Sequence, residues 1–201
     1  FGMVAVEAAA HGLPTVAFGT GGIVDAVAEG RSGRLVAPGD YEGFCDAALA
    51  LLREQRYQLL QFHFHTPSEE TINGKHTAMV GHFVHKNAAG QLGVVAVLIQ
   101  PGFTPRNAAY APIFDRLPQP NQTVTLDDNA LDLAAMLPAD KGYYSFDGSL
   151  TTPPCSEAVN WMVLKRPVTL GKDQIKAFRR LFNANARPVQ PLNGRVVKES
   201  L

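Results

Sequence analysis

The sequence predicts an α+β protein built from two halves whose hydrophobic patterns differ. Residues 1–55 alternate apolar helices with short β-branched strands in the order αβαβα, which is typical of a parallel, doubly wound (Rossmann-like) sheet. Residues 56–201 contain mostly strand-like segments, which favours a mostly antiparallel or mixed β-sheet. The composition changes near Arg53–Arg56 without a linker rich in Pro, Gly or Ser. We therefore expect two domains, 1–55 and 56–201.

The elements of the first half follow from residue type and spacing. An Ala-rich stretch predicts a helix over Met3–Ala10, and a β-branched stretch predicts a strand over Leu13–Phe18. A second helix and strand are expected over Ile23–Ala28 and Arg34–Ala37, separated by glycines. Apolar residues at helical spacing predict a last helix from Tyr41 to about Glu54.

In the second half, long apolar stretches and alternation predict strands at five places. These strands are Tyr57–His65, Thr77–His85, Leu92–Gln100, Thr123–Leu126 and Asn160–Lys165. A helix is expected over Asn107–Leu117. A second is expected over Asp173–Phe182, because Ile175, Phe178 and Phe182 fall on one helical face.

Composition excludes several classes of partner. Lys and Arg number 18, Asp and Glu also number 18, and the formal net charge is zero at pH 7. A neutral chain has no electrostatic basis for binding nucleic acid or an anionic membrane surface. No apolar run approaches the length that spans a bilayer. Residues 1–12 lack the basic flank and cleavage site of a signal peptide, so the sequence indicates no compartment.

Three histidines form the candidate chemical site. In the stretch QFHFHTPSE, a strand places His63 and His65 on one face and Phe64 on the other. His82 lies on a second predicted strand, and pairing of the two strands would bring all three imidazoles together. Three neutral imidazoles leave one open corner of a tetrahedral zinc ion, as a catalytic zinc requires. Spacing alone also allows the alternative that these are polar residues on a solvated sheet face.

Four segments carry a family resemblance. QFHFHTPSE, GHFVHKN, GSLTTPPCSEAVNW and RPVQPLNGRVV occur in this order. Together they resemble the α-class carbonic anhydrases over about residues 57–201. The resemblance implies a sheet of that type, with Zn²⁺ as cofactor and His63, His65 and His82 as its ligands. It also implies reversible hydration of carbon dioxide to bicarbonate as the reaction.

The resemblance further implies roles for the residues around the metal. Thr151 would accept a hydrogen bond from the hydroxide on zinc, and Glu69 would accept the proton of Thr151. Gln61 would hold His63, and the backbone carbonyl of Asn185 would hold His65. The pocket for carbon dioxide would be formed by Val84, Val94, Leu150, Thr152, Val159 and Trp161.

The chain departs from the family pattern in three ways. Val80 stands where the family has a glutamate that accepts a hydrogen bond from His82, and such a loss weakens metal affinity or activity roughly 10- to 100-fold. Relatives have strands and a proton-shuttling histidine before QFHFH, so we expect unpaired strand edges, self-association and slow proton release here. Relatives often pair the cysteine at position 155 with one in that region. Here only Cys45 is available, so free thiols are expected.

The first half resembles another family. FGMVAVEAAAHGLPTVAFGTGGIVDAV and SGRLVAPGD are similar to the nucleotide-sugar-binding half of GT-B glycosyltransferases, group 1, and Glu7 matches a glutamate that contacts the donor ribose. The chain is therefore interpreted as a chimera. Its leading function is zinc-dependent carbon dioxide hydration, impaired by the truncation and by Val80. The alternatives are a catalytically silent scaffold that at most binds zinc, and a nucleotide-sugar-binding fragment.

Overall fold

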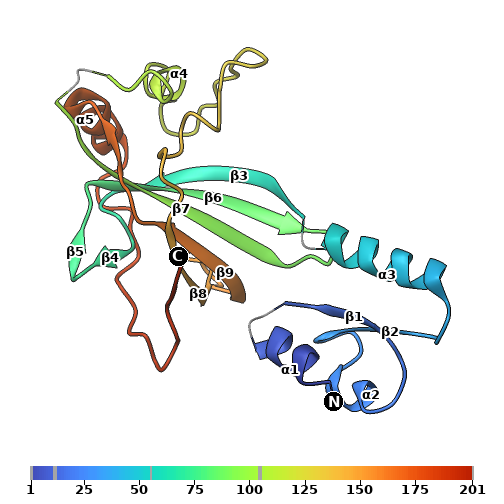
Figure 1. Ribbon diagram of the computed structural model, residues 1–201. Coiled ribbons are helices and arrows are strands. Elements are labelled where there is room, and N and C mark those ends of the chain that lie inside the picture. The colour runs from blue at the N-terminus through green and yellow to red at the C-terminus, as the bar shows by residue number, and fades with distance from the viewer. Residues whose placement is uncertain (1, 11–12, 55, 104–105, 201) are drawn as a thin grey trace. The chain divides into compact units, whose positions relative to one another are not determined.

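The computed structural model shows two compact units along the chain (Figure 1). It describes residues 2–10, 13–54, 56–103 and 106–200 of the 201-residue sequence. The first unit comprises Phe1–Tyr57 and Asn87–Ala89, and the second comprises Gln58–Lys86 and Gly90–Leu201. Within the described ranges, no helix has both the length and the apolar character needed to cross a membrane.

The first unit is a small α/β arrangement. Its elements are α1 (Met3–Ala10), β1 (Thr15–Phe18), α2 (Ile23–Ala26), β2 (Gly33–Val36) and α3 (Tyr41–Glu54). β1 and β2 pair in parallel, with α2 between them in the sequence. The ring of Phe18 packs 5.4 Å from Tyr41 and 5.1 Å from Phe44, which attaches α3 to the two strands. The order of elements matches the expectation. The bounds of α1 and α3 are as predicted, and those of β1, α2 and β2 differ by one or two residues.

A mixed seven-stranded sheet forms the centre of the second unit. Its strands are β3 (Tyr57–His65), β6 (Met79–Asn87), β7 (Leu92–Pro101), β8 (Tyr143–Ser149), β9 (Glu157–Leu164), β10 (Val168–Leu170) and β11 (Lys198–Glu199). The order is β11-β8-β9-β7-β6-β3, and β10 pairs with the end of β7. β7 is parallel to β9 and β10, whereas β6–β7, β8–β9 and β8–β11 are antiparallel.

A hairpin and two helices complete this unit. β4 (Thr71–Ile72) pairs with β5 (Lys75–His76). The helices are α4 (Ala111–Phe114) and α5 (Lys172–Leu181). At the start of α5, the side-chain oxygen of Gln174 accepts hydrogen bonds from the backbone N–H groups of Gly171, at 3.0 Å, and Asn107, at 2.9 Å. One buried glutamine thus ties the first turn of α5 to a distant loop.

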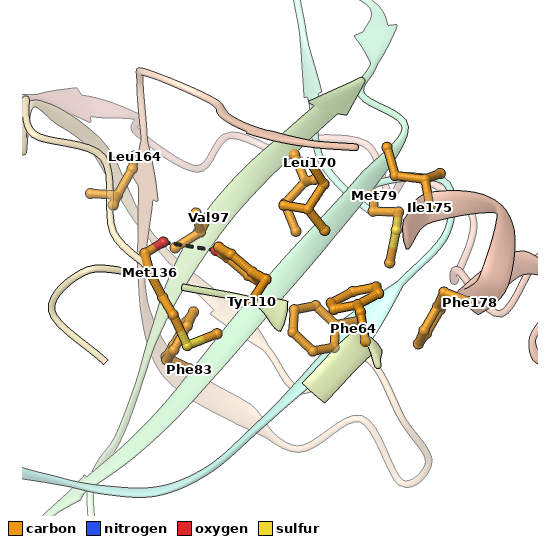
Figure 2. Packing of buried hydrophobic residues seen from close by; sticks show 12 residues of the cluster. Phe64, Met79, Phe83, Val97, Tyr110, Met136, Leu164, Leu170, Ile175 and Phe178 are labelled. Atoms are coloured by element: carbon orange, nitrogen blue, oxygen red, sulfur yellow. Dashed lines mark hydrogen bonds between the residues drawn. The ribbon is translucent and has the colours of Figure 1, made fainter. Parts of the chain in front are cut away.

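Strand alternation divides the apolar side chains of the sheet between two faces. One cluster contains alternate residues of the central strands together with residues of α4 and α5 (Figure 2). Its buried members are Phe64, Met79, Phe83, Val97, Ile99, Tyr110, Phe114, Met136, Leu164, Leu170, Ile175 and Phe178. The second cluster takes the intervening strand positions. Its buried members are Val80, Val84, Val94, Ala96, Leu98, Val159, Trp161 and Val163.

The structure corrects two sequence predictions. Thr123–Leu126 forms no strand, because β-branched composition produces a strand only where a sheet partner is available. The helix predicted over Asn107–Leu117 is confined to α4 and is preceded by turns. The strands β8, β10 and β11 and the β4–β5 hairpin were not predicted, since they are short or lack a clear apolar alternation.

Tyr110 provides a test of the first cluster. Its side chain is fully buried, and its hydroxyl donates a 2.7 Å hydrogen bond to the carbonyl of Met136 (Figure 2). Tyr110→Phe leaves that carbonyl without a partner, so we expect the free energy of unfolding to fall by about 1–3 kcal/mol. The readout is urea unfolding followed by the fluorescence of Trp161, the single tryptophan, which lies in the same unit. The control is Tyr57→Phe at a more exposed position. Equal midpoints for both variants would contradict the assignment.

Candidate metal centre

Three imidazoles from two neighbouring strands converge in the second unit. The ring centroids are 4.9 Å apart for His63 and His65, 5.5 Å for His63 and His82, and 4.8 Å for His65 and His82. One nitrogen can be chosen from each ring so that all three lie within 4.8 Å of one another. The structure therefore brings together the three histidines that the sequence singled out.

The convergence follows from the sheet. β3 is the neighbour of β6, so side chains on the same face of both strands meet. His63 and His65 are two residues apart and share one face of β3, whereas Phe64 between them joins the first cluster on the other face. His82 lies between Val80 and Val84, which belong to the second cluster. The three rings thus occupy the face of the sheet that carries the second cluster.

Two of the rings are oriented by acceptors that the sequence had suggested. The Nδ1 atom of His63 lies 2.8 Å from Oε1 of Gln61, and Nδ1 of His65 lies 3.1 Å from the backbone carbonyl of Asn185. Asn185 is held in turn, because its side-chain amide donates to the carbonyl of Phe64 at 3.0 Å and its Oδ1 accepts from the N–H of Thr66 at 2.8 Å. A loop distant in sequence is therefore fastened directly to the strand that carries two of the histidines.

The third ring has an acceptor that was not foreseen. The Nε2 atom of His82 lies 2.8 Å from Oε1 of Glu70. The expectation that Val80 leaves His82 without a protein partner is therefore wrong. Val80 itself is fully buried among apolar side chains. Sequence periodicity could not identify Glu70, because residues 69 and 70 lie in a bend where the strand alternation rule does not apply.

The donor set fits a zinc ion. After these contacts, the remaining ring nitrogens are Nε2 of His63, Nε2 of His65 and Nδ1 of His82. The Nε2 atom of His65 is buried and has no hydrogen-bond partner among the described residues, as expected for a nitrogen reserved for a metal. Zinc–nitrogen bonds of about 2.0–2.1 Å in a tetrahedron place the nitrogens about 3.3 Å apart. The ring nitrogens of this structure lie within 4.8 Å of one another, somewhat wider than that spacing.

The electrostatics keep at least two of these rings neutral. Burial, together with the nearby imidazoles of His82 and His65, lowers the pKa of His63 from 6.5 to about 4. Burial also lowers the pKa of His65, although the carboxylate of Glu69 opposes that shift. Metal binding requires the neutral imidazole, so the site favours the protonation state that a metal needs.

Glu69 lies beside two of the imidazoles, and no hydrogen bond joins it to Thr151. Oε1 of Glu69 accepts a 2.6 Å hydrogen bond from the backbone N–H of Arg187 and lies 3.3 Å from Nδ1 of His65. Its Oε2 is buried and has no hydrogen-bond partner in the described part of the chain. Glu69 and Thr151 both line a cavity of about 560 Å³. Arg187, which orients Glu69 and also reaches the hydroxyl of Ser149 at 3.2 Å, was not singled out from the sequence.

The residues predicted to form an apolar pocket are mostly gathered in the second cluster. Val84, Val94, Val159 and Trp161 are buried members, and Leu150 packs against them. The Trp161 ring lies 4.9 Å from the His82 ring at 81°, and its indole N–H donates to the carbonyl of Ser149 at 3.1 Å. Thr152 is exposed. The cluster therefore provides an apolar wall next to one of the three imidazoles.

Glu7 and the two cysteines are the remaining residues that the sequence singled out. Glu7 is an exposed residue of α1 in the first unit. Cys45 and Cys155 are both free thiols, as expected. Among the described residues, the group that could hold a metal ion consists of the three histidines.

Comparison with known proteins matches most of the chain to one family. Residues 43–201 match the eukaryotic-type carbonic anhydrases. A carbonic anhydrase from Klebsiella pneumoniae is 51% identical over 144 residues, which cover 70% of this chain and 57% of the relative. One from Pectobacterium atrosepticum is 44% identical over 148 residues, covering 73% of this chain and 60% of the relative. The chain thus spans less than two thirds of the length of these curated relatives.

Structural comparison points to the same fold. The solved complex of α-carbonic anhydrase from Thermovibrio ammonificans with the inhibitor sulfanilamide superposes with a TM-score of 0.67 at 43% identity. That alignment covers 71% of this chain and 62% of the other. Residues 1–54 separately match glycosyl transferases group 1, a segment too short to establish a fused glycosyltransferase. The mostly β-sheet unit has the α-carbonic anhydrase fold, and the chain belongs to the eukaryotic-type carbonic anhydrase family.

Proposed function

We propose that this chain catalyses the reversible hydration of carbon dioxide to bicarbonate and a proton, at a zinc ion held by His63, His65 and His82. The observation that carries the proposal is the convergence of three imidazoles. Each has one ring nitrogen at hydrogen-bonding distance from a protein acceptor, which leaves the other nitrogen for a metal. The named relatives are carbonic anhydrases, a family of zinc enzymes. Because the chain spans less than two thirds of the length of these relatives, we extend their activity to it as a proposal.

The proposed chemistry divides between the metal and the apolar wall. When bound, zinc acts as a Lewis acid that lowers the pKa of a water molecule to about 7. The acceptors at Gln61, Asn185 and Glu70 hold the imidazoles so that their lone pairs face a common point. Val84, Val94, Leu150, Val159 and Trp161 are proposed to hold carbon dioxide, a linear molecule with little hydrogen-bonding capacity.

Thr151 and Glu69 are proposed to orient the nucleophile. The buried Oε2 of Glu69 has no hydrogen-bond partner among the described residues and is suited to accept a hydrogen bond from the hydroxyl of Thr151. That bond would leave a lone pair of the threonine oxygen to accept a hydrogen bond from the attacking species. Arg187 fixes the other oxygen of Glu69 through its backbone N–H. Thr152 is proposed to lie at the entrance to the substrate site.

The fold and origin of residues 1–55 are the subject of a separate proposal. We propose that residues 1–55 form a Rossmann-like fragment similar to part of the glycosyl transferases group 1, joined to a carbonic-anhydrase-like domain at 56–201. The parallel β1–β2 pair with its intervening helix supports this reading. Self-association is also proposed, because β3 ends the strand order and has one sheet neighbour among the described strands.

Removal of one ligand tests the proposed function. We expect the purified protein to bind one zinc ion per chain and to hydrate carbon dioxide in a reaction that sulfanilamide inhibits. His82→Ala removes a ligand, so zinc affinity should fall by more than the roughly 10- to 100-fold that follows loss of an outer hydrogen-bond partner. Hydration should fall to the uncatalysed rate. The readouts are zinc content after dialysis and stopped-flow carbon dioxide hydration.

The matched control is His85→Gln, on the opposite face of the same strand. His85 lies three residues beyond His82, and its Nδ1 meets the carbonyl of Phe83 at 2.8 Å. This variant should keep both zinc and activity. One zinc per chain without turnover would refute the enzymatic proposal and leave the zinc-binding scaffold. Absence of bound zinc in the unmodified protein would refute both.

The lowered pKa of His63 predicts a pH dependence of stability in the metal-free protein. Between pH 6.5 and about 4 the unfolded chain binds more protons at this residue than the folded chain does. The free energy of unfolding should therefore be highest above pH 6.5 and should fall as the pH is lowered towards 4. Urea midpoints at pH 7, 6 and 5 measure the slope. His63→Asn should reduce the slope without abolishing it, because the pKa of His65 is also lowered. An unchanged slope in the variant would show that His63 is not responsible.

A further inference from the structure

His82 is the most deeply buried of the three candidate ligands, and it has an unusual partner. Its side chain is 1% exposed, and its Nε2 lies 2.8 Å from Oε1 of Glu70, whose side chain is 12% exposed. A buried imidazole N–H without an acceptor would lose the hydrogen bond that water gives it in the unfolded chain, and this would destabilise the fold. Val80, on the same face of β6, has no polar atom to offer. The carboxylate of Glu70 therefore supplies the hydrogen bond from outside the strand that carries the ligand.

The backbone of Glu70 is held in place by a buried serine. The hydroxyl of Ser68 donates a 2.7 Å hydrogen bond to the carbonyl of Glu70, and it accepts a 2.9 Å bond from the N–H of Thr77. The N–H of Ser68 donates to the carbonyl of Thr77 at 3.1 Å. Ser68 is fully buried. The bend before the β4–β5 hairpin is thus fastened to the segment that leads into β6, and this attachment places the carboxylate over His82.

The contact has a direct consequence for the tautomer of His82. A carboxylate accepts hydrogen bonds only, so the proton of a neutral His82 ring lies on Nε2. Its Nδ1 then presents a lone pair on the side of His63 and His65. The competing carboxylate, Glu69, has its Oε2 3.8 Å from Nδ1 of His82, beyond hydrogen-bonding distance. Glu70 is therefore the group that decides which nitrogen of His82 is available to a metal.

We propose that Glu70 is the positioning residue of this centre, which fixes the tautomer and ring orientation of His82 and thereby replaces the acceptor that Val80 cannot provide. The inference rests on the proposed function only in taking zinc as the metal. Glu70 acts through its contact with His82. Its second oxygen, Oε2, is buried without a hydrogen-bond partner among the described residues, so the contact with His82 is the main polar interaction of this carboxylate.

Two substitutions at position 70 test the proposal. Glu70→Ala removes the acceptor, and zinc affinity measured by chelator competition should fall about 10- to 100-fold. Glu70→Gln keeps the size and one acceptor oxygen but removes the charge, so a smaller loss is expected. In the metal-free proteins, nitrogen-15 shifts of the His82 ring should report the Nε2–H tautomer in the unmodified chain. They should report a mixture of tautomers in Glu70→Ala.

The tautomer readout separates this inference from the proposed enzyme activity, because it needs neither zinc nor turnover. Glu157→Gln, at an exposed position on β9, is the matched control and should change neither zinc affinity nor the His82 shifts. If Glu70→Ala does not fold, the zinc affinity of Glu70→Gln decides, because this variant keeps an acceptor oxygen for His82 and is expected to differ in affinity. Zinc affinity and tautomer that match the unmodified chain would overturn the proposal. In Glu70→Ala, a loss of affinity with an unchanged tautomer would overturn it too, since Glu70 would then not act through the tautomer of His82.

Discussion

The whole site depends on one constraint, the alternation of side chains along two neighbouring strands. Residues two apart on β3 share a face, and the adjoining strand β6 presents His82 on that same face. A slip of one residue in the pairing of these strands would move His82 to the opposite face. The apolar positions prevent that slip, because it would also exchange the members of the two hydrophobic clusters. Core packing therefore fixes the geometry of the metal centre.

Hydrogen-bond acceptors orient the three rings, and two of these acceptors lie outside β3 and β6. Gln61 lies on the same strand as His63, but the other two acceptors come from a bend and from a loop far along the chain. Asn185 contacts β3 through both its backbone and its side chain. The centre thus depends on the folding of the whole β-rich unit rather than on the local strand pair. Loss of the distant loop would remove the acceptor that orients His65.

The sequence predicted the strands that carry the ligands because those strands have strong apolar patterns. β3 was predicted with its observed bounds, and the helix α5 was displaced by one residue. Weak patterns failed: Thr123–Leu126 has strand-forming residues but no partner strand, and β8 has a partner but little alternation. At the site, Glu70 was missed because its side chain reaches His82 from a bend. No periodicity describes the direction of side chains in such a segment.

The ligand set itself can be tested most directly by X-ray absorption of the zinc-loaded protein. The account predicts three nitrogen scatterers of imidazole type at about 2.0–2.1 Å and one oxygen in the fourth position. Fewer than three imidazoles, or a sulfur scatterer at about 2.3 Å from one of the two free cysteines, would contradict it.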